Sequence, residues 1–198
     1  MMKIVKQYYV WVVFVVAVVA QFWFPISTII ENNDILTTGE EFCIQTAPID
    51  PADPFRGRYL EINIEARVSD KIRESLKDEG GYYKSNCYIR LIKGADGFAE
   101  VVEISDEPLS GSGILKLDRV NVSDRNPTIR LPFDRYYMAE DLAPEAERIY
   151  RNAIWRNDGE LTAHVTIRVK NGRGVISGMY IEDVRIEDYV REYLNRNP

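Results

Sequence analysis

Apolar residues form one long uninterrupted stretch near the N-terminus. Residues 8–24 read YYVWVVFVVAVVAQFWF, with no charged residue and a single strongly polar one, Gln21. As a helix this stretch is about 25 Å long, and the apolar residues 25–30 extend it towards the roughly 30 Å of a bilayer core. Aromatic residues gather at both of its ends, as they do where helices cross membrane interfaces. The pattern predicts a transmembrane anchor over residues 1–30 that binds the bilayer through residues 8–24.

The charges that flank this stretch predict its orientation. Lys3 and Lys6 precede it, and Glu31 and Asp34 follow it. Basic flanks stay in the cytoplasm, so the N-terminus is expected inside the cell and the rest of the chain outside. A cleaved signal peptide is the alternative, because residues 18–20 are small, but the apolar run continues beyond them. A buried core helix would need apolar surroundings on every face.

Beyond residue 40, apolar and polar residues mostly alternate, which is the pattern of strands with one buried face. Residues 59–68 and 161–169 alternate most regularly, and Asn171-Gly172 predicts a tight hairpin turn after the second of these segments. Other strands are expected at residues 41–47, 87–92, 98–104, 114–122, 128–132 and 175–181.

Helical spacing of apolar residues interrupts the alternation at residues 146–154 and 186–194, and a short helix is expected over residues 70–77. The sequence therefore predicts a mainly β, α+β fold, in which a transmembrane helix precedes one antiparallel β-barrel or sandwich-like domain with two or three short helices. The expected divisions are the anchor at residues 1–30, a linker at 31–40 and an extracytoplasmic β-rich domain at 41–198.

A proline-rich segment resembles a known family. Residues 50–62 read DPADPFRGRYLEI. This segment is similar to the motif of the GDYXXLXY family of small bacterial membrane-anchored proteins, in which a Gly-Asp-Tyr segment follows an Asp-Pro-x-Asp-x-x-Arg run. The apolar helix, the Thr38-Gly39 pair and a later Arg-Tyr-Tyr-x-x-Glu segment occur in the family's order, so that the resemblance covers nearly the whole chain. The later segment consists of Arg135, Tyr136, Tyr137 and Glu140.

The chain resembles a divergent member of that family. Gly57 and Tyr59 match the motif, whereas Arg58, Ile62 and Ile64 stand where the motif has Asp, Leu and Tyr. The resemblance implies an envelope protein of the bacterial inner membrane, with its domain in the periplasm and no established activity. It also implies a partner hypothesis, because such proteins are often encoded beside multi-spanning membrane proteins.

The loop at residues 50–57 is the first candidate site, at the start of the strand that contains Tyr59. Two prolines stiffen the loop, and Asp50 and Asp53 can hydrogen-bond its backbone or accept a bidentate pair from Arg56. Gly57 allows an unusual backbone angle or close packing. The loop is interpreted either as a rigid turn that sets the register of the strand or as a recognition surface. Arg135, Tyr136, Tyr137 and Glu140 are expected to form a packed strand-to-helix corner and are the second candidate.

Charge and residue usage narrow the remaining function classes. The formal net charge is −6 with a pI near 5.0, and no Lys/Arg cluster is present, so nucleic-acid binding is not expected. His164 is the one histidine and falls on the polar face of its strand, where a solvated position is expected. The cysteines lack metal-ligand spacing, so no metal or cofactor is expected.

Cys43 and Cys87 are one candidate disulfide, because both fall in expected strands and an external compartment permits oxidation. Cys87 lies on an apolar face, whereas Cys43 shares its phase with the polar residues Glu41 and Gln45, which argues against the bond. A Cα separation beyond about 7 Å would rule it out.

We expect a non-catalytic binding or accessory module for an envelope membrane protein. The alternative is an envelope hydrolase of signal-peptidase-like architecture, which needs a serine nucleophile and a buried lysine base. Ser110 and Ser112 lie in the one loop that suits this alternative, although Ser-Gly runs are usually turns.

Overall fold

The computed structural model describes residues 2–47, 59–77, 82–122, 127–155 and 163–196. The chain divides into two compact units, Met1–Thr38 and Gly39–Pro198. Each unit is considered by itself.

The first unit is a single helix, α1 (Met2–Thr38). Its segment Trp11–Thr38 is long and apolar enough to cross a membrane, with a mean hydropathy of 2.2 in its most apolar window. The helix includes the predicted span at residues 8–24 and continues through most of the predicted linker at 31–40. The polar residues there do not stop the helix, which ends at Thr38, directly before Gly39; the Thr38 hydroxyl donates to Asp34 O of the preceding turn at 2.8 Å.

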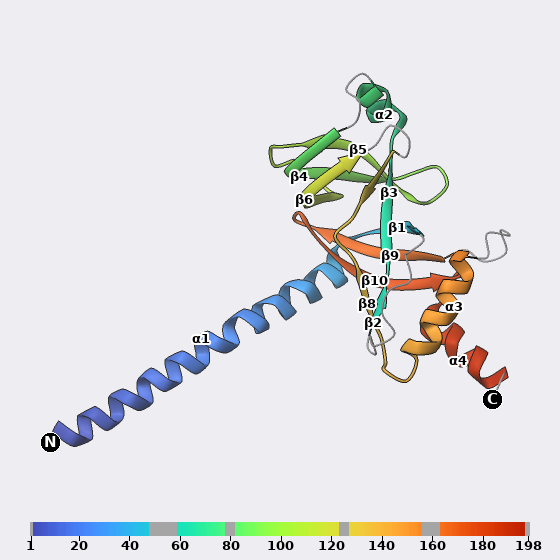
Figure 1. Cartoon of the computed structure of the whole chain (residues 1–198). Helices are drawn as coiled ribbons and strands as arrows, with labels where there is room; N and C mark the ends of the chain where they lie inside the picture. The colour runs from blue at the N-terminus through green and yellow to red at the C-terminus, as the bar shows by residue number, and fades with distance from the viewer. Residues whose placement is uncertain (1, 48–58, 78–81, 123–126, 156–162, 197–198) are drawn as a thin grey trace. The chain divides into compact units, whose positions relative to one another are not determined.

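The second unit is built on one mixed sheet (Figure 1). In the described residues its order is β11-β10-β9-β1-β3-β5-β4-β6, and β7 pairs with β3 beside this path. A separate ribbon consists of β2 and β8. The bounds are β1 (Glu40–Ala47), β2 (Tyr59–Glu61), β3 (Asn63–Val68), β4 (Tyr82–Lys93), β5 (Ala99–Ser105), β6 (Ile114–Val122), β7 (Thr128–Arg130), β8 (Arg135–Tyr137), β9 (Ala163–Lys170), β10 (Arg173–Ile181) and β11 (Val184–Arg185).

The predicted mainly β, α+β class is confirmed, and the sheet differs from the expected antiparallel barrel or sandwich in two respects. β3 and β5 pair in parallel, whereas the other strand pairs recorded in the described residues are antiparallel. The sheet also does not close into a barrel. A bridge between Leu115 and Gly172, with the Lys116 N–H donating to Gly172 O at 2.8 Å, joins β6 to the β9–β10 turn.

The alternating segments form the expected strands because one face of each is buried. Leu60, Ile62, Ile64, Ala66 and Val68 are all buried in the core. The segment is divided into β2 and β3 at Ile62, since β2 pairs with β8 whereas β3 pairs with β1, β5 and β7. Residues of β9 on the same side of the sheet are buried likewise.

The predicted hairpin turn between β9 and β10 is confirmed. Asn171 and Gly172 have φ values of 52° and 77°. Two successive positive φ angles are those of the type I′ turn that suits the twist of a two-residue hairpin.

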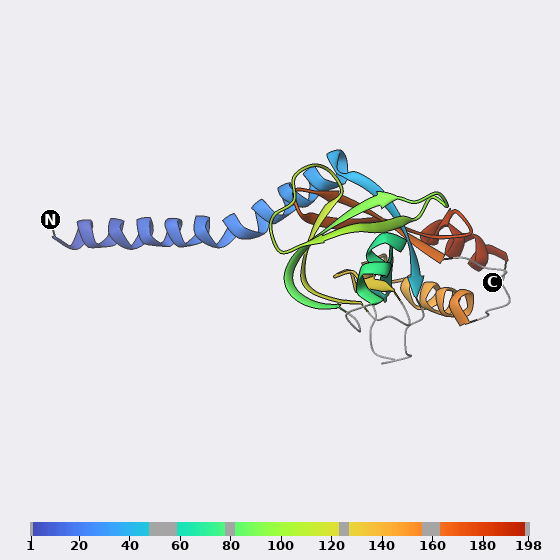
Figure 2. The same cartoon turned by 90° about the horizontal axis from the view of Figure 1, so that it is seen from above.

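The predicted helices are present as α2 (Asp70–Lys77), α3 (Ala143–Trp155) and α4 (Ile186–Arg196). Figures 1 and 2 show α3 and α4 side by side near β2, whereas α2 follows the far end of β3. The buried residues Ile186 and Val190 attach α4 to the core. The helical pair thus lies at the end of the domain that contains the β2–β8 ribbon.

Candidate functional site

The described end of the first segment that resembles the family motif, Tyr59–Glu61, lies next to the second segment in the fold. Antiparallel pairing of β2 and β8 sets Tyr59 opposite Tyr137, Leu60 opposite Tyr136 and Glu61 opposite Arg135. The paired residues of β2 and β8 are about 75 positions apart along the chain, and they share one ribbon. Alternation along β8 sends Tyr136 inward and its two neighbours outward.

The outward residues stack on one another. The Arg135 guanidinium carbon lies 5.0 Å from the centroid of the Tyr59 ring, and the rings of Tyr59 and Tyr137 are 5.7 Å apart with a tilt of 57°. A hydrogen bond with Tyr137 raises the pKa of Arg135, and the nearby Tyr59 and Asp134 raise it further. Tyr137 is nevertheless 66% exposed. Together Tyr59, Arg135 and Tyr137 form the Tyr–Arg surface, in which Arg135 and Tyr137 are exposed, Tyr59 is half-buried and the members restrain one another.

The inward residue, Tyr136, fixes this ribbon to the C-terminal helix. Its hydroxyl donates a hydrogen bond to Glu187 Oε1 of α4 at 2.6 Å. Burial, reinforced by this bond, raises the pKa of Tyr136 to about 12. Arg185 lies 3.4 Å from the other oxygen of Glu187. The buried tyrosine therefore keeps its proton over the physiological range and holds the Tyr–Arg surface against α4.

The other predicted site residues have different positions. Asp50, Asp53, Arg56 and Gly57 lie outside the described residues, so their expected pairing stays a prediction. Glu140 is exposed in the turn that leads into α3. Of the four residues expected in a packed strand-to-helix corner, Tyr136 alone is buried, whereas Arg135, Tyr137 and Glu140 are exposed. Tyr59, from the first motif, lies beside Arg135 and Tyr137.

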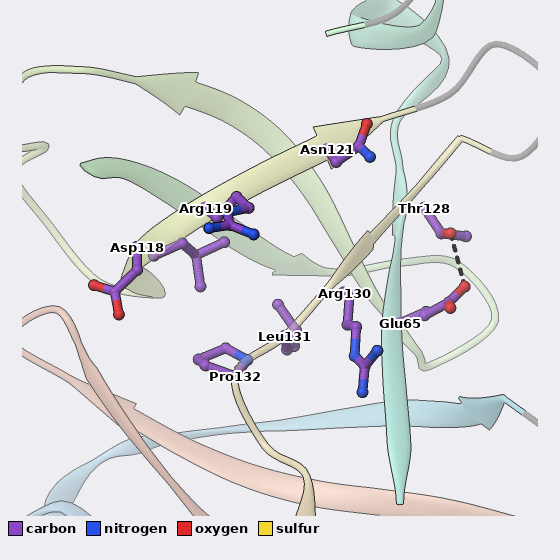
Figure 3. A pocket seen from close by; sticks show the side chains of 9 residues that line it. Glu65, Asp118, Arg119, Asn121, Thr128, Arg130, Leu131 and Pro132 are labelled. Atoms are coloured by element: carbon purple, nitrogen blue, oxygen red, sulfur yellow. Dashed lines mark hydrogen bonds between the residues drawn. The ribbon is translucent and has the colours of Figure 1, made fainter. Parts of the chain in front are cut away.

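A pocket of about 510 Å³ opens between β6 and β7. Its polar lining consists of residues from three strands, and Figure 3 shows Arg119 on β6 and Arg130 on β7 with Leu131 between them. This arginine pocket is lined by Glu65, Leu117, Asp118, Arg119, Asn121, Thr128, Arg130, Leu131 and Pro132. Sequence reasoning missed it, because Arg119 and Arg130 occur as ordinary outward residues of separate strands and carry no motif.

The charged residues that line this pocket are two arginines and two carboxylates, Glu65 and Asp118. Glu65 lies directly opposite Arg130 in the β3–β7 register. Its two oxygens accept hydrogen bonds from Thr128 Oγ1 at 2.8 Å and from Asn63 Nδ2 at 3.0 Å. Within the part of the chain that the structure describes, no ion pair is formed by Arg119 or Arg130.

His164 is less solvated than its place on the polar face of β9 predicts. Its ring stacks on Tyr180 at 5.1 Å with an interplanar angle of 8°, and Phe98 approaches edge-on at 6.2 Å. Burial lowers the pKa of His164, and Asp183 opposes the shift. The imidazole is therefore neutral at pH 7.

The two cysteines do not form the predicted disulfide and are free thiols. Cys43 forms an isolated backbone β-bridge with Phe98, next to the β4–β5 turn. Cys87 lies opposite Leu117, well before the end of β4 at Lys93. That length of strand separates the two residues by roughly 20 Å, far beyond disulfide reach. Burial raises the pKa of both thiols.

The remaining candidate chemistry is limited. Arg90 donates hydrogen bonds to the carbonyl oxygens of Ser110 and Ser112, which fixes the backbone of the Ser-Gly loop. Among the described residues, no group of three or more His, Cys, Asp or Glu side chains is arranged to hold a metal ion.

Comparison with known proteins identifies one similarity. The sequence model of a family described as GDYXXLXY protein matches residues 21–179. That description names a sequence motif and no activity. The search of curated proteins and the search of solved structures gave no match.

Proposed function

Because this chain belongs to the GDYXXLXY protein family, we propose that it is a membrane-anchored binding module that holds a protein partner at the outer face of the bacterial inner membrane. The anchor is α1, whose apolar segment has the length of a bilayer span. Lys3 and Lys6 before the span and Glu31 and Asp34 within its far end favour a cytoplasmic N-terminus and a periplasmic domain.

The Tyr–Arg surface is the observation that carries the binding proposal. Tyrosine and arginine dominate the energetics of protein interfaces, because they bury a large area and keep a polar group for the partner. Arg135 and Tyr59 are already stacked, so less side-chain entropy is lost on binding than at a surface of independent side chains. Both segments that resemble the family motif contribute to this surface. A non-catalytic contact to a multi-spanning membrane protein fits these features best.

Photo-crosslinking of the full-length chain in its own membrane tests the proposal. A photoreactive phenylalanine analogue replaces Tyr137, and the same analogue replaces Tyr83 as a matched control, because these tyrosines are 66% and 65% exposed. We expect a discrete adduct with a multi-spanning membrane protein from position 137 alone, and its loss when Arg135→Ala is added. Equal adducts from both positions, or none from position 137 in membrane-inserted protein, would contradict the proposal.

The anchor and its orientation have their own tests. Mass spectrometry of the membrane-extracted chain should recover the segment 8–24, and a mature N-terminus at Gln21 would instead identify a cleaved signal peptide. Protease added to spheroplasts should digest the domain without lysis. Protection until lysis would place the domain in the cytoplasm.

A further inference from the structure

The arginine pocket between β6 and β7 has the features of a small-molecule site. We propose that it binds a small organic oxyanion, a carboxylate or phosphate carried by a short apolar group, with Arg119 and Arg130 as its cationic donors. The pocket lies on strands other than those of the Tyr–Arg surface, so this inference does not depend on a protein partner.

The shape of the pocket comes from the pairing of its two strands. β6 forms hydrogen bonds with β4, and β7 with β3, so no ladder closes the space between β6 and β7 in the described residues. The volume of about 510 Å³ falls in the range of small-molecule sites. Leu117, Leu131 and Pro132 supply apolar lining, which suits a ligand with a hydrocarbon part.

The placement of the charges in the pocket, two arginines and two carboxylates, leaves both arginines open to an anionic ligand. Glu65 faces Arg130 across the ladder, but its oxygens accept hydrogen bonds from Thr128 and Asn63, and the two side chains form no ion pair in the described residues. Arg119 lies opposite the uncharged Ser85, and Figure 3 shows Asp118 directed away from Arg119. The guanidinium donors are therefore available, and their fork geometry matches the oxygens of a carboxylate or phosphate.

The neighbouring pocket on the other side of Glu65 and Thr128 is a useful contrast. It has a similar volume, about 520 Å³, and also contains two arginines. There Arg67 is paired with Asp96, and Arg73 lies 3.9 Å from Asp70. That pocket is lined by two ion-paired arginines and three carboxylates, whereas the arginine pocket has two arginines without ion pairs and two carboxylates, so the arginine pocket is better suited to an external anion.

Calorimetric titration of the full-length chain in neutral detergent tests the proposal, with protein-free micelles as the blank. The probes are hexanoate, hexyl phosphate, inorganic phosphate and the cation hexyltrimethylammonium. We expect saturable binding of at least one hexyl anion, weaker binding of inorganic phosphate and none of the cation. The hexyl anion that binds more tightly shows whether the pocket prefers a carboxylate or a phosphate head group.

Variants locate the binding in the pocket. Arg119→Gln and Arg130→Gln should each weaken the anion about tenfold, as expected for the loss of a charge-assisted hydrogen bond. Arg73→Gln makes the same charge change in the neighbouring pocket and should leave the affinity unchanged. Arg130→Lys keeps the charge without the fork and should fall between wild type and Arg130→Gln.

Several results would overturn the proposal. These are no saturable binding of either hexyl anion at 10 mM (roughly the weak end of small-ligand affinity), cation binding equal to that of the anions, or unchanged affinity in the Arg119→Gln/Arg130→Gln double variant. Inorganic phosphate binding as tightly as hexyl phosphate would overturn the role of the apolar lining. Far-UV circular dichroism of each variant checks that its fold is retained.

Discussion

The Tyr–Arg surface and the arginine pocket use the same residue type in opposite ways. Arg135 is stacked on Tyr59 and lies close to Tyr137. Arg119 and Arg130 have no ion pair within the described residues, although Glu65 lies opposite Arg130 across the ladder. The comparison shows that the partners of an arginine, more than its exposure, determine what it can do. A restrained arginine presents a fixed surface, whereas an unpaired arginine in a hollow is available to a ligand.

The largest expected effect distinguishes the inward from the outward residues of β8. Tyr136→Ala should lower the free energy of unfolding by about 3–5 kcal/mol, because a buried aromatic ring is lost from the core. Tyr137→Ala, at a 66% exposed position, is the matched control and should change it by less than about 1 kcal/mol. Pulse proteolysis of the full-length chain over a urea series measures both. Equal losses of unfolding free energy in the two variants would show that burial of Tyr136 does not hold the Tyr–Arg surface in place.

Alkaline pH tests the contribution of Tyr136 to stability without removing its side chain from the core. The folded chain holds the Tyr136 proton more tightly than the unfolded chain, since the pKa rises from 10.0 to about 12. This contribution to stability is complete below pH 10 and is lost as the pH rises through 12, by about 1–2 kcal/mol once solvent screening is allowed for. Urea unfolding at pH 9 and pH 11.5 measures the loss. In Tyr136→Phe, the part of the stability loss between pH 9 and pH 11.5 that comes from ionisation of Tyr136 should be absent.

Removal of single arginines tests the comparison directly. Arg135→Ala should lower the thermal midpoint by about 2 °C, because the cation–π contact with Tyr59 is lost. Arg130→Ala should leave the midpoint unchanged or raise it slightly, since the side chain has no ion pair in the described part of the chain. Differential scanning calorimetry of the full-length chain in detergent gives both values. A larger fall for Arg130→Ala would reverse the assignment of roles.

The smallest expected effect concerns His164, which is restrained by aromatic neighbours on the sheet face. Its lowered pKa means that the unfolded chain binds the proton more readily. Stability is therefore complete above pH 6.5 and falls as the pH drops through the folded-state pKa, by less than about 1 kcal/mol for a half-buried group. Because the chain has one histidine, an NMR titration reports this pKa without ambiguity. A pKa at or above 6.5 would mean that the stack on Tyr180 does not exclude water.

Local features of the fold could be predicted from the sequence. The alternation from Leu60 to Val68 indicated buried strands because side-chain direction depends only on neighbouring positions. Asn171-Gly172 identified its turn because few residues tolerate two positive φ angles. The sequence underestimates the extent of α1, since the polar residues after position 30 suggest a linker although residues 31–38 contain neither proline nor glycine.

Features that depend on distant parts of the chain could not be predicted. The parallel pairing of β3 with β5 has no recognisable signal in the sequence of either strand. The contact of Tyr59 with Tyr137 depends on which strands pair, and the arginine pocket depends on how far β6 and β7 diverge. Cys43 and Cys87 were considered a pair because both fall in strands, but the sheet order separates them.

The pairing of the first strand with one of the last has a consequence for how the chain folds. β1 follows α1 directly and pairs with β9, where Arg168 and Glu41 are bonded across 127 residues. As the polypeptide is synthesised, β1 must wait with an unpaired edge until nearly the entire domain has followed. Such long-range pairing slows folding and exposes the waiting edge to aggregation. The sheet can therefore be completed at β1 only when synthesis is almost finished, and we expect chains truncated before β9 to be removed by proteases.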